Sequence, residues 1–268
     1  MTTFQKIIKY CAIAFALFLT VSIITGIVGA VSGVTYLFSG RTAAGEMKTY
    51  TIGDPVRNLE IELSGAELEI RTGENFQVES NHKYLKLENS EGSLRIRENR
   101  PAFGSNPGGI RVRLTVPEEY VFEKADISAG AGMMKIDVLQ ADTLSLDLGA
   151  GEASIGTLAA NTNARINGGA GELTIRDGKL ANLNFDMGIG ETDLTCALTG
   201  NCEIDYGVGE LNLTLAGTAD DYRITLDKGL GEAMLNNEAM SDGTVYGNGE
   251  NSIDIDGGVG DLRIRFRD

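Results

Sequence analysis

The sequence is poor in several residues on which catalytic and structural sites depend. Its 268 residues include one histidine, three cysteines, four prolines and no tryptophan. A Ser or Cys nucleophile needs a neighbouring base, and the single candidate, His82, lies in a polar stretch where we expect an exposed side chain. Collagen is excluded because proline is scarce and the glycines have no three-residue period. The composition therefore argues against a hydrolase triad and a triple helix.

The cysteines offer little further chemistry. Cys11 lies in an apolar run, whereas Cys196 and Cys202 are six residues apart near the middle of the chain. Two cysteines without a second pair or partner histidines do not make a zinc site. Cys202 occupies an inward position of a predicted strand, which predicts a buried side chain. A disulfide across the intervening turn and two free buried thiols are the alternatives for this pair.

Positive charge is scarce after the first 41 residues. The basic residues before position 42 are Lys6, Lys9 and Arg41, so residues 42–268 carry 20 basic against 38 acidic side chains. Such a field repels nucleic acid and anionic lipid headgroups, and it attracts cations or basic partners. We therefore expect no nucleic-acid partner. Hydrophobic residues make up 42% of the chain, which argues against disorder.

A long uncharged segment precedes the acidic part of the chain. Residues 10–40 contain no charged side chain, and about 20 apolar residues suffice for a helix to cross a bilayer. We predict a transmembrane helix over 10–40, with residues 1–9 as a cytoplasmic tip that holds Lys6 and Lys9. The alternative is a signal peptide cleaved after the small residues 28–30. The chain is thus expected to be single-pass with an extracytoplasmic C-terminal domain, or secreted after cleavage.

Small residues in this segment recur four positions apart. Ser22, Gly26 and Ala30 form one series, and Gly29 and Gly33 form another. This spacing lets two membrane helices approach closely, so it predicts a face for self-association. The alternative explanation is that glycine is common in membrane helices in general.

Glycine is the residue in excess, 35 of 268, and its positions define an internal repeat. The pattern Gly-x-Gly-Glu begins at Gly149, Gly169, Gly188, Gly207 and Gly229. Looser or degenerate copies are centred on Gly130-Ala131-Gly132, Gly247-Asn248-Gly249, Gly258-Val259-Gly260, Ser64-Gly65-Ala66 and Ser90-Glu91-Gly92. The repeat therefore covers nearly all of the acidic part of the chain.

The flanks of each glycine pair predict strands. Apolar residues alternate before the first glycine, as Leu183, Phe185 and Met187 do, which is the period of a β-strand. After the second glycine the alternation shifts by one residue. A bulge or corner makes this shift, and glycine adopts the positive φ that it needs. Each unit is therefore predicted to be a strand, a glycine corner and a second strand.

Units of about 20 residues with two short strands cannot bury their own apolar faces, so they are expected to stack. We predict an all-β fold: a parallel right-handed β-solenoid of about ten coils over 58–268, with a linker or first strand at 41–57 and an irregular loop near 98–109. The alternative is an antiparallel meander of hairpins. Parallel stacking predicts an interior ladder of Leu146, Ile166, Phe185, Ile204 and Leu226.

The Gly-x-Gly-Glu corners with their strand flanks resemble those of a known family over roughly Leu59 to Asp268. This is the family of membrane-anchored β-strand-repeat proteins classed as "putative adhesins", a domain of unknown function. The repeat is also similar to the C-terminal domain of LiaF-type bacterial envelope-stress proteins, which usually have several membrane spans where one is predicted here. The resemblance implies a bacterial, β-helix-like exported domain, and it supplies no catalytic motif.

Acidic residues occupy fixed positions around the corners, either two residues before the first glycine or directly after the second. The first series contains Asp147, Asp186, Asp205 and Asp227, with the polar Asn167 at the equivalent position of one copy. The second series contains Glu152, Glu172, Glu191, Glu210 and Glu232. Stacking sets like charges about 4.8 Å apart, which costs roughly 0.9 kcal/mol per pair in water. A Ca²⁺-binding stripe would relieve this repulsion. The alternative, hydrogen bonds from the corner amides to each glutamate, needs no metal.

These observations predict a non-catalytic, membrane-anchored extracytoplasmic module of the adhesin kind, with Ca²⁺ as the one candidate cofactor. Its expected partner is a protein or another ligand of the cell envelope. The alternative function is envelope-stress sensing or regulation through a membrane partner. A third class, a carbohydrate-active enzyme, would use paired carboxylates, although acidic repeats supply such pairs by accident.

Overall fold

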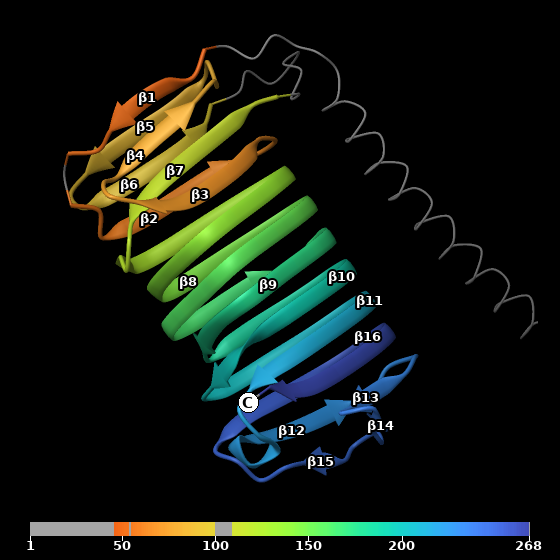
Figure 1. Ribbon diagram of the computed structural model, residues 1–268. Helices are drawn as coiled ribbons and strands as arrows, with labels where there is room; N and C mark the ends of the chain where they lie inside the picture. Colours follow the sequence, from red (N-terminus) through yellow and green to blue (C-terminus); the bar gives the residue numbers. More distant parts are fainter. Residues whose placement is uncertain (1–45, 54, 100–108, 268) are drawn as a thin grey trace, which may run out of the picture. The chain divides into compact units, whose positions relative to one another are not determined.

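The computed structural model of the chain describes residues 46–53, 55–99 and 109–267 (Figure 1). Two compact units divide at Gly40, and the described residues all belong to the second unit, Arg41–Asp268. The predicted membrane span at 10–40, including its small-residue face, lies outside the described residues. Within them, no helix has both the length and the apolar character to cross a bilayer.

The described part of the second unit consists mainly of β-strands joined in one 16-stranded sheet, with one short 3-10 helix, η1 (Ala219–Asp221). The strands are β1 Lys48–Thr51, β2 Asn58–Leu63, β3 Glu67–Gly73, β4 Gln77–Ser80, β5 Leu85–Ser90, β6 Ser93–Glu98, β7 Arg111–Pro117, β8 Val121–Asn167, β9 Ala170–Ala181, β10 Leu183–Thr199, β11 Asn201–Ala216, β12 Tyr222–Asp227, β13 Ala233–Leu235, β14 Glu238–Ala239, β15 Val245–Tyr246 and β16 Asn251–Arg267.

The glycine corners bend the chain without interrupting its strand pairing, which explains why β8 continues for 47 residues. The second glycine of each pair that forms a corner has a positive φ, as the one-residue shift in the sequence predicts. At Gly190 φ is +144°, and a Cβ atom there would lie 1.8 Å from the carbonyl oxygen of Gly171 in the next coil. Only glycine can adopt this φ and also tolerate such a close approach.

Successive coils stack in parallel and in register, so the solenoid prediction is confirmed and the antiparallel meander is wrong for the repeat. Phe185 of β10 pairs with Ile166 of β8 on one side and with Ile204 of β11 on the other. All three side chains are buried, as is Leu146. The core therefore lies between the two strands of each coil, and each layer supplies equivalent apolar residues. The right-handed winding and the count of about ten coils stay predictions.

The order of the coils in space differs from their order in the sequence at both ends. Strand β16 lies between β11 and β12, so Ile255 separates Ile204 from Leu226 (Figure 1). The predicted contact of Ile204 with Leu226 in the interior ladder is therefore wrong. At the other end, β2 lies between β8 and β6, and β3 lies between β8 and β7. Toward both ends of the described region, strands that follow one another in the sequence are therefore separated in the sheet by a third strand.

Antiparallel strands cover the outer coils, and they account for two predicted repeat copies that are not corners. Residues 90–92 form the tight turn of the β5–β6 hairpin, where Glu91 and Gly92 both have positive φ. Residues 247–250 connect β15 to the start of β16. Other antiparallel pairs are β1–β4–β7 at one end and β12–β15 and β13–β14 at the other. Such hairpins protect the edges of a sheet from pairing with other chains.

Candidate functional site

The stacked corners bring together three lanes of side chains, which we call the corner face. Its middle lane holds the residue between the two glycines. In the C-terminal half this residue is a larger aliphatic, and we call Ile189, Val208, Val259 and Leu230 the aliphatic ridge. Neighbouring members of the ridge are paired in register in this spatial order. Exposure rises along it, because Ile189 and Val208 are half-buried whereas Val259 is 47% and Leu230 73% exposed.

The first acidic row runs along one side of the corners. In spatial order it contains Asp147, Asn167, Asp186, Asp205, Asp256 and Asp227. Asn167 donates a side-chain hydrogen bond to Asp147. Asp205 is exposed, but partial loss of its solvation raises the pKa of its carboxyl, and the neighbouring carboxylates Asp256 and Asp186 raise it further. Sequence reasoning placed most of this row correctly but missed Asp256, because β16 enters the stack out of order.

The second acidic row runs along the other side of the corners. In spatial order it contains Glu152, Glu172, Glu191, Glu210, Asp261 and Glu232. The Arg263 guanidinium donates to Glu210 and to Asp261, the latter at 3.3 Å, and the Asn212 amide donates to Glu210 at 3.1 Å. Part of this row is therefore neutralised by neighbouring side chains.

The corner backbone is hydrogen-bonded mainly between coils. The amide of Ile189 donates to the carbonyl of Gly169, and the amide of Leu230 donates to that of Gly258, both at 2.8 Å. Some corner amides reach a carboxylate instead: the Glu232 N–H donates to Asp261 at 3.2 Å, and the Ser64 N–H donates to Glu98 at 2.7 Å. Among residues 46–53, 55–99 and 109–267, no group of three or more His, Cys, Asp or Glu side chains is arranged to hold a metal ion.

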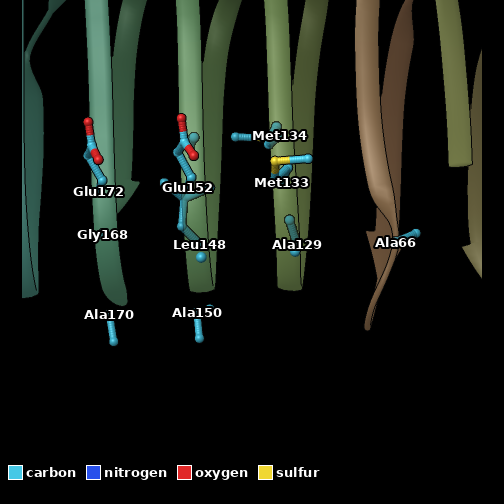
Figure 2. Close-up of a pocket in the computed structure, with 14 residues that line it drawn as sticks. Ala66, Ala129, Met133, Met134, Leu148, Ala150, Glu152, Gly168, Ala170 and Glu172 are labelled. Carbon is cyan, nitrogen blue, oxygen red and sulfur yellow. The ribbon is translucent and has the colours of Figure 1, made fainter. Parts of the chain in front are cut away.

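Where the middle lane holds alanine, the corner face has a shallow hollow. Figure 2 shows Glu152 and Glu172 side by side on neighbouring coils, with Ala150 and Ala170 at the tips of their corners. The cavity beside them measures about 30 Å³, which is room for about one water molecule. A second, polar hollow of about 370 Å³ is lined by residues that include Asn163, Asn184 and Arg165.

The prediction of an exposed His82 is wrong, because the side chain is buried at 3% exposure beside Glu98 at 0%. Its Nδ1 accepts a hydrogen bond from the Tyr84 amide at 3.0 Å, so the proton lies on Nε2, which contacts Glu98 Oε1 at 3.0 Å. Glu98 also accepts the amide of Ser64 at 2.7 Å. The pair thus fixes the first corner of the chain. Both ring nitrogens are engaged, so His82 is not placed as a catalytic base.

Cys196 and Cys202 are both buried free thiols, which decides between the two alternatives for this pair. Burial raises the pKa of both thiols. At Cys196 the pKa lies well above its usual range. Cys202 contacts the carbonyl of Thr199 at 3.7 Å. The inward position that the sequence predicts for Cys202 is confirmed, and both residues act as small members of the core.

The stacked glycine corners and parallel coils define the class of the protein as a β-solenoid repeat domain. A family model, Toastrack DUF4097, matches residues 56–245, and the chain belongs to this family of unknown function. No curated protein matches the chain.

Three solved structures are similar to the chain over most of its length. A putative cell adhesion protein from Clostridium sporogenes has 15% identity and a TM-score of 0.35, covering 83% of this chain and 99% of that one. A putative adhesin from Bacteroides fragilis has 10% identity and a TM-score of 0.34, covering 82% and 96%. A putative adhesin from Parabacteroides distasonis has 13% identity and a TM-score of 0.31, covering 83% and 98%.

Proposed function

We propose that the chain is a non-catalytic binding module of the adhesin kind, anchored in the cytoplasmic membrane by residues 10–40 and exposed outside it. The observation that carries the proposal is the corner face, where equivalent side chains repeat in register from coil to coil. Solenoids commonly use such extended, rigid surfaces for recognition. The stacked apolar residues of the core and the pairing between coils hold these side chains in place. Little conformational entropy would therefore be lost on binding.

The buried polar groups of the described region support a role without catalysis. His82 is the only histidine of the chain, and both of its nitrogens are engaged in the core. The thiols of Cys196 and Cys202 are held protonated by burial, which suits a core residue rather than a nucleophile.

Display of the full chain on a non-adhering bacterial host tests the proposal. We expect more cells to be retained on envelope or matrix surfaces than with an empty host. A membrane-impermeant amine reagent should label the exposed Lys83, Lys86 and Lys124 in intact cells. Equal retention with and without the chain would contradict a binding function, and labelling only after lysis would contradict extracytoplasmic exposure.

The small-residue series in the predicted span supports a second candidate function, envelope-stress sensing or regulation through a membrane partner. Ser22, Gly26 and Ala30, or Gly29 and Gly33, would supply the helix contact, with a partner or with a second copy. Replacement of Gly26 and Gly29 by Leu should abolish a stress-reporter response while leaving attachment unchanged. An unchanged response would remove this candidate.

A further inference from the structure

We propose that the aliphatic ridge and its two acidic rows form a docking surface for a basic amphipathic α-helix of another protein. The inference rests on the proposed binding function and names the chemistry of its partner. Apolar side chains on the partner helix would cover the ridge, and its Lys and Arg residues would face the carboxylates on both sides.

The ridge is apolar surface with nothing covering it in the described chain. Leu230 at 73% and Val259 at 47% are among the most exposed large hydrophobic residues. Ile189 and Val208 continue the same line on the next two coils. Each of these side chains stands between two glycines, so the backbone on either side leaves room for the side chains of a partner. Exposed apolar surface with a polar rim is typical of protein interaction sites.

The charges beside the ridge indicate that the partner is positively charged. Among the described residues, no carboxylate of the first acidic row forms an ion pair. Partial desolvation and repulsion by its neighbours already raise the pKa of Asp205. In the corner segments of the four ridge coils the basic side chains are Lys228 and Arg263. A cationic partner gains from this field, whereas a second copy of this acidic chain or an anionic membrane would be repelled.

The spacing of the coils favours a helix over an extended segment. Adjacent ridge residues lie about one strand spacing apart, roughly 4.8 Å. A helix presents one face every 5.4 Å, so over three coil steps the mismatch grows to only about 2 Å. An extended strand presents the same face about every 6.8 Å, and its mismatch grows to about 6 Å over the same distance. Helices with apolar anchors at such intervals are a common mode of peptide recognition.

The sequence itself supplies a conservative way to remove the ridge. Ala150 and Ala170 occupy the same position in neighbouring coils of the native chain, so Ile189→Ala, Val208→Ala, Val259→Ala and Leu230→Ala are compatible with the corner. The matched control combines Val121→Ala and Val245→Ala, which remove exposed apolar side chains outside the corner face, 43% and 53% exposed. Circular dichroism of both variants checks that the fold is intact.

The test measures binding of the full chain in detergent to a fluorescent helical peptide with one leucine face and lysine flanks. A peptide of the same composition in scrambled order, and one with glutamate in place of lysine, are the controls. We expect the wild-type chain and the control variant to bind the leucine–lysine helix, and the ridge variant to bind at least about tenfold more weakly.

Equal affinity of the ridge variant, or equal binding of the scrambled peptide, would overturn the inference and leave only diffuse attraction between charges. Failure of the wild-type chain to bind the helix would overturn it as well. Host-cell attachment that survives loss of the ridge would overturn this inference alone. Ridge-dependent peptide binding without any attachment of cells would overturn the proposed function instead.

Discussion

The second glycine of each corner is predicted to be required both for its backbone conformation and for its close contact with the next coil. Four Gly→Ala variants separate these two causes. Gly53 has neither feature, since nothing lies within 4 Å of its Cβ position and its φ is ordinary. Gly243 has only the positive φ, at +66° in open space. Gly188 has only the close contact, 2.0 Å from the Gly169 oxygen, and Gly190 has both.

The expected loss of unfolding free energy rises in the same order. Gly53→Ala should change it by less than about 0.5 kcal/mol. Gly243→Ala should cost about 1 kcal/mol because alanine is strained at positive φ. Gly188→Ala should cost about 1–3 kcal/mol because the coils must move apart. Gly190→Ala should cost about 3–5 kcal/mol, since a Cβ atom 1.8 Å from the Gly171 oxygen adds to the strain.

Urea unfolding of the unit Arg41–Asp268 provides the measurement, followed by circular dichroism because the chain has no tryptophan. The midpoint should fall in the order Gly53, Gly243, Gly188, Gly190, with an unchanged slope for the first two variants. If Gly190→Ala unfolds at the same urea concentration as Gly53→Ala, neither the φ nor the contact stabilises the corner, and the reasoning is refuted.

Three further predictions concern the charged groups. Asp205 has a raised pKa in the fold, so its ionised form costs stability that is regained as pH falls through that pKa. In low salt, Asp205→Asn should therefore stabilise the protein by about 0.5 kcal/mol at pH 7, after allowance for solvent screening. Near pH 3 the substitution should have no effect. A stabilisation that is the same at both pH values would contradict this prediction. Glu98→Gln should lower the unfolding free energy by about 1–3 kcal/mol, because His82 and the Ser64 amide lose their charged acceptor; an unchanged urea midpoint would contradict it. Millimolar Ca²⁺ and Mg²⁺ should raise the melting temperature equally by screening the acidic rows, and a rise specific to Ca²⁺ that chelator reverses would show a dedicated site.

Much of the fold could be predicted because a glycine pair and a one-residue shift of the apolar alternation mark each corner in the sequence. The one-residue shift of apolar parity located the positive φ of Gly190, and alternation located the core position of Phe185. The spatial order of the coils could not be predicted in this way. Ile255 and Leu226 stand at equivalent positions of similar strands, so the pattern does not specify which one contacts Ile204.

The candidate site was predicted less completely than the fold. The acidic rows follow from fixed spacing, whereas the exposure of Val259 and Leu230 depends on where each corner turns away from the core. Val259 and Leu230 continue the alternation of apolar residues of the preceding strand. The pattern alone therefore predicts that they are buried. His82 lies in the loop between β4 and β5, and its burial depends on Glu98 at the end of β6, in a region without the repeat. Only long-range packing brings the two together.

The central claim, that the corner face is the binding surface, is tested most directly by photocrosslinking in intact cells. A photoreactive phenylalanine analogue is placed in the full chain at Val259 on the ridge, or at Asn184 in the polar hollow as the matched control. We predict that Val259 gives a discrete protein adduct whose attached segment is basic and amphipathic, and that Asn184 does not. The same adduct from both positions, or an adduct from Asn184 alone, would contradict the claim.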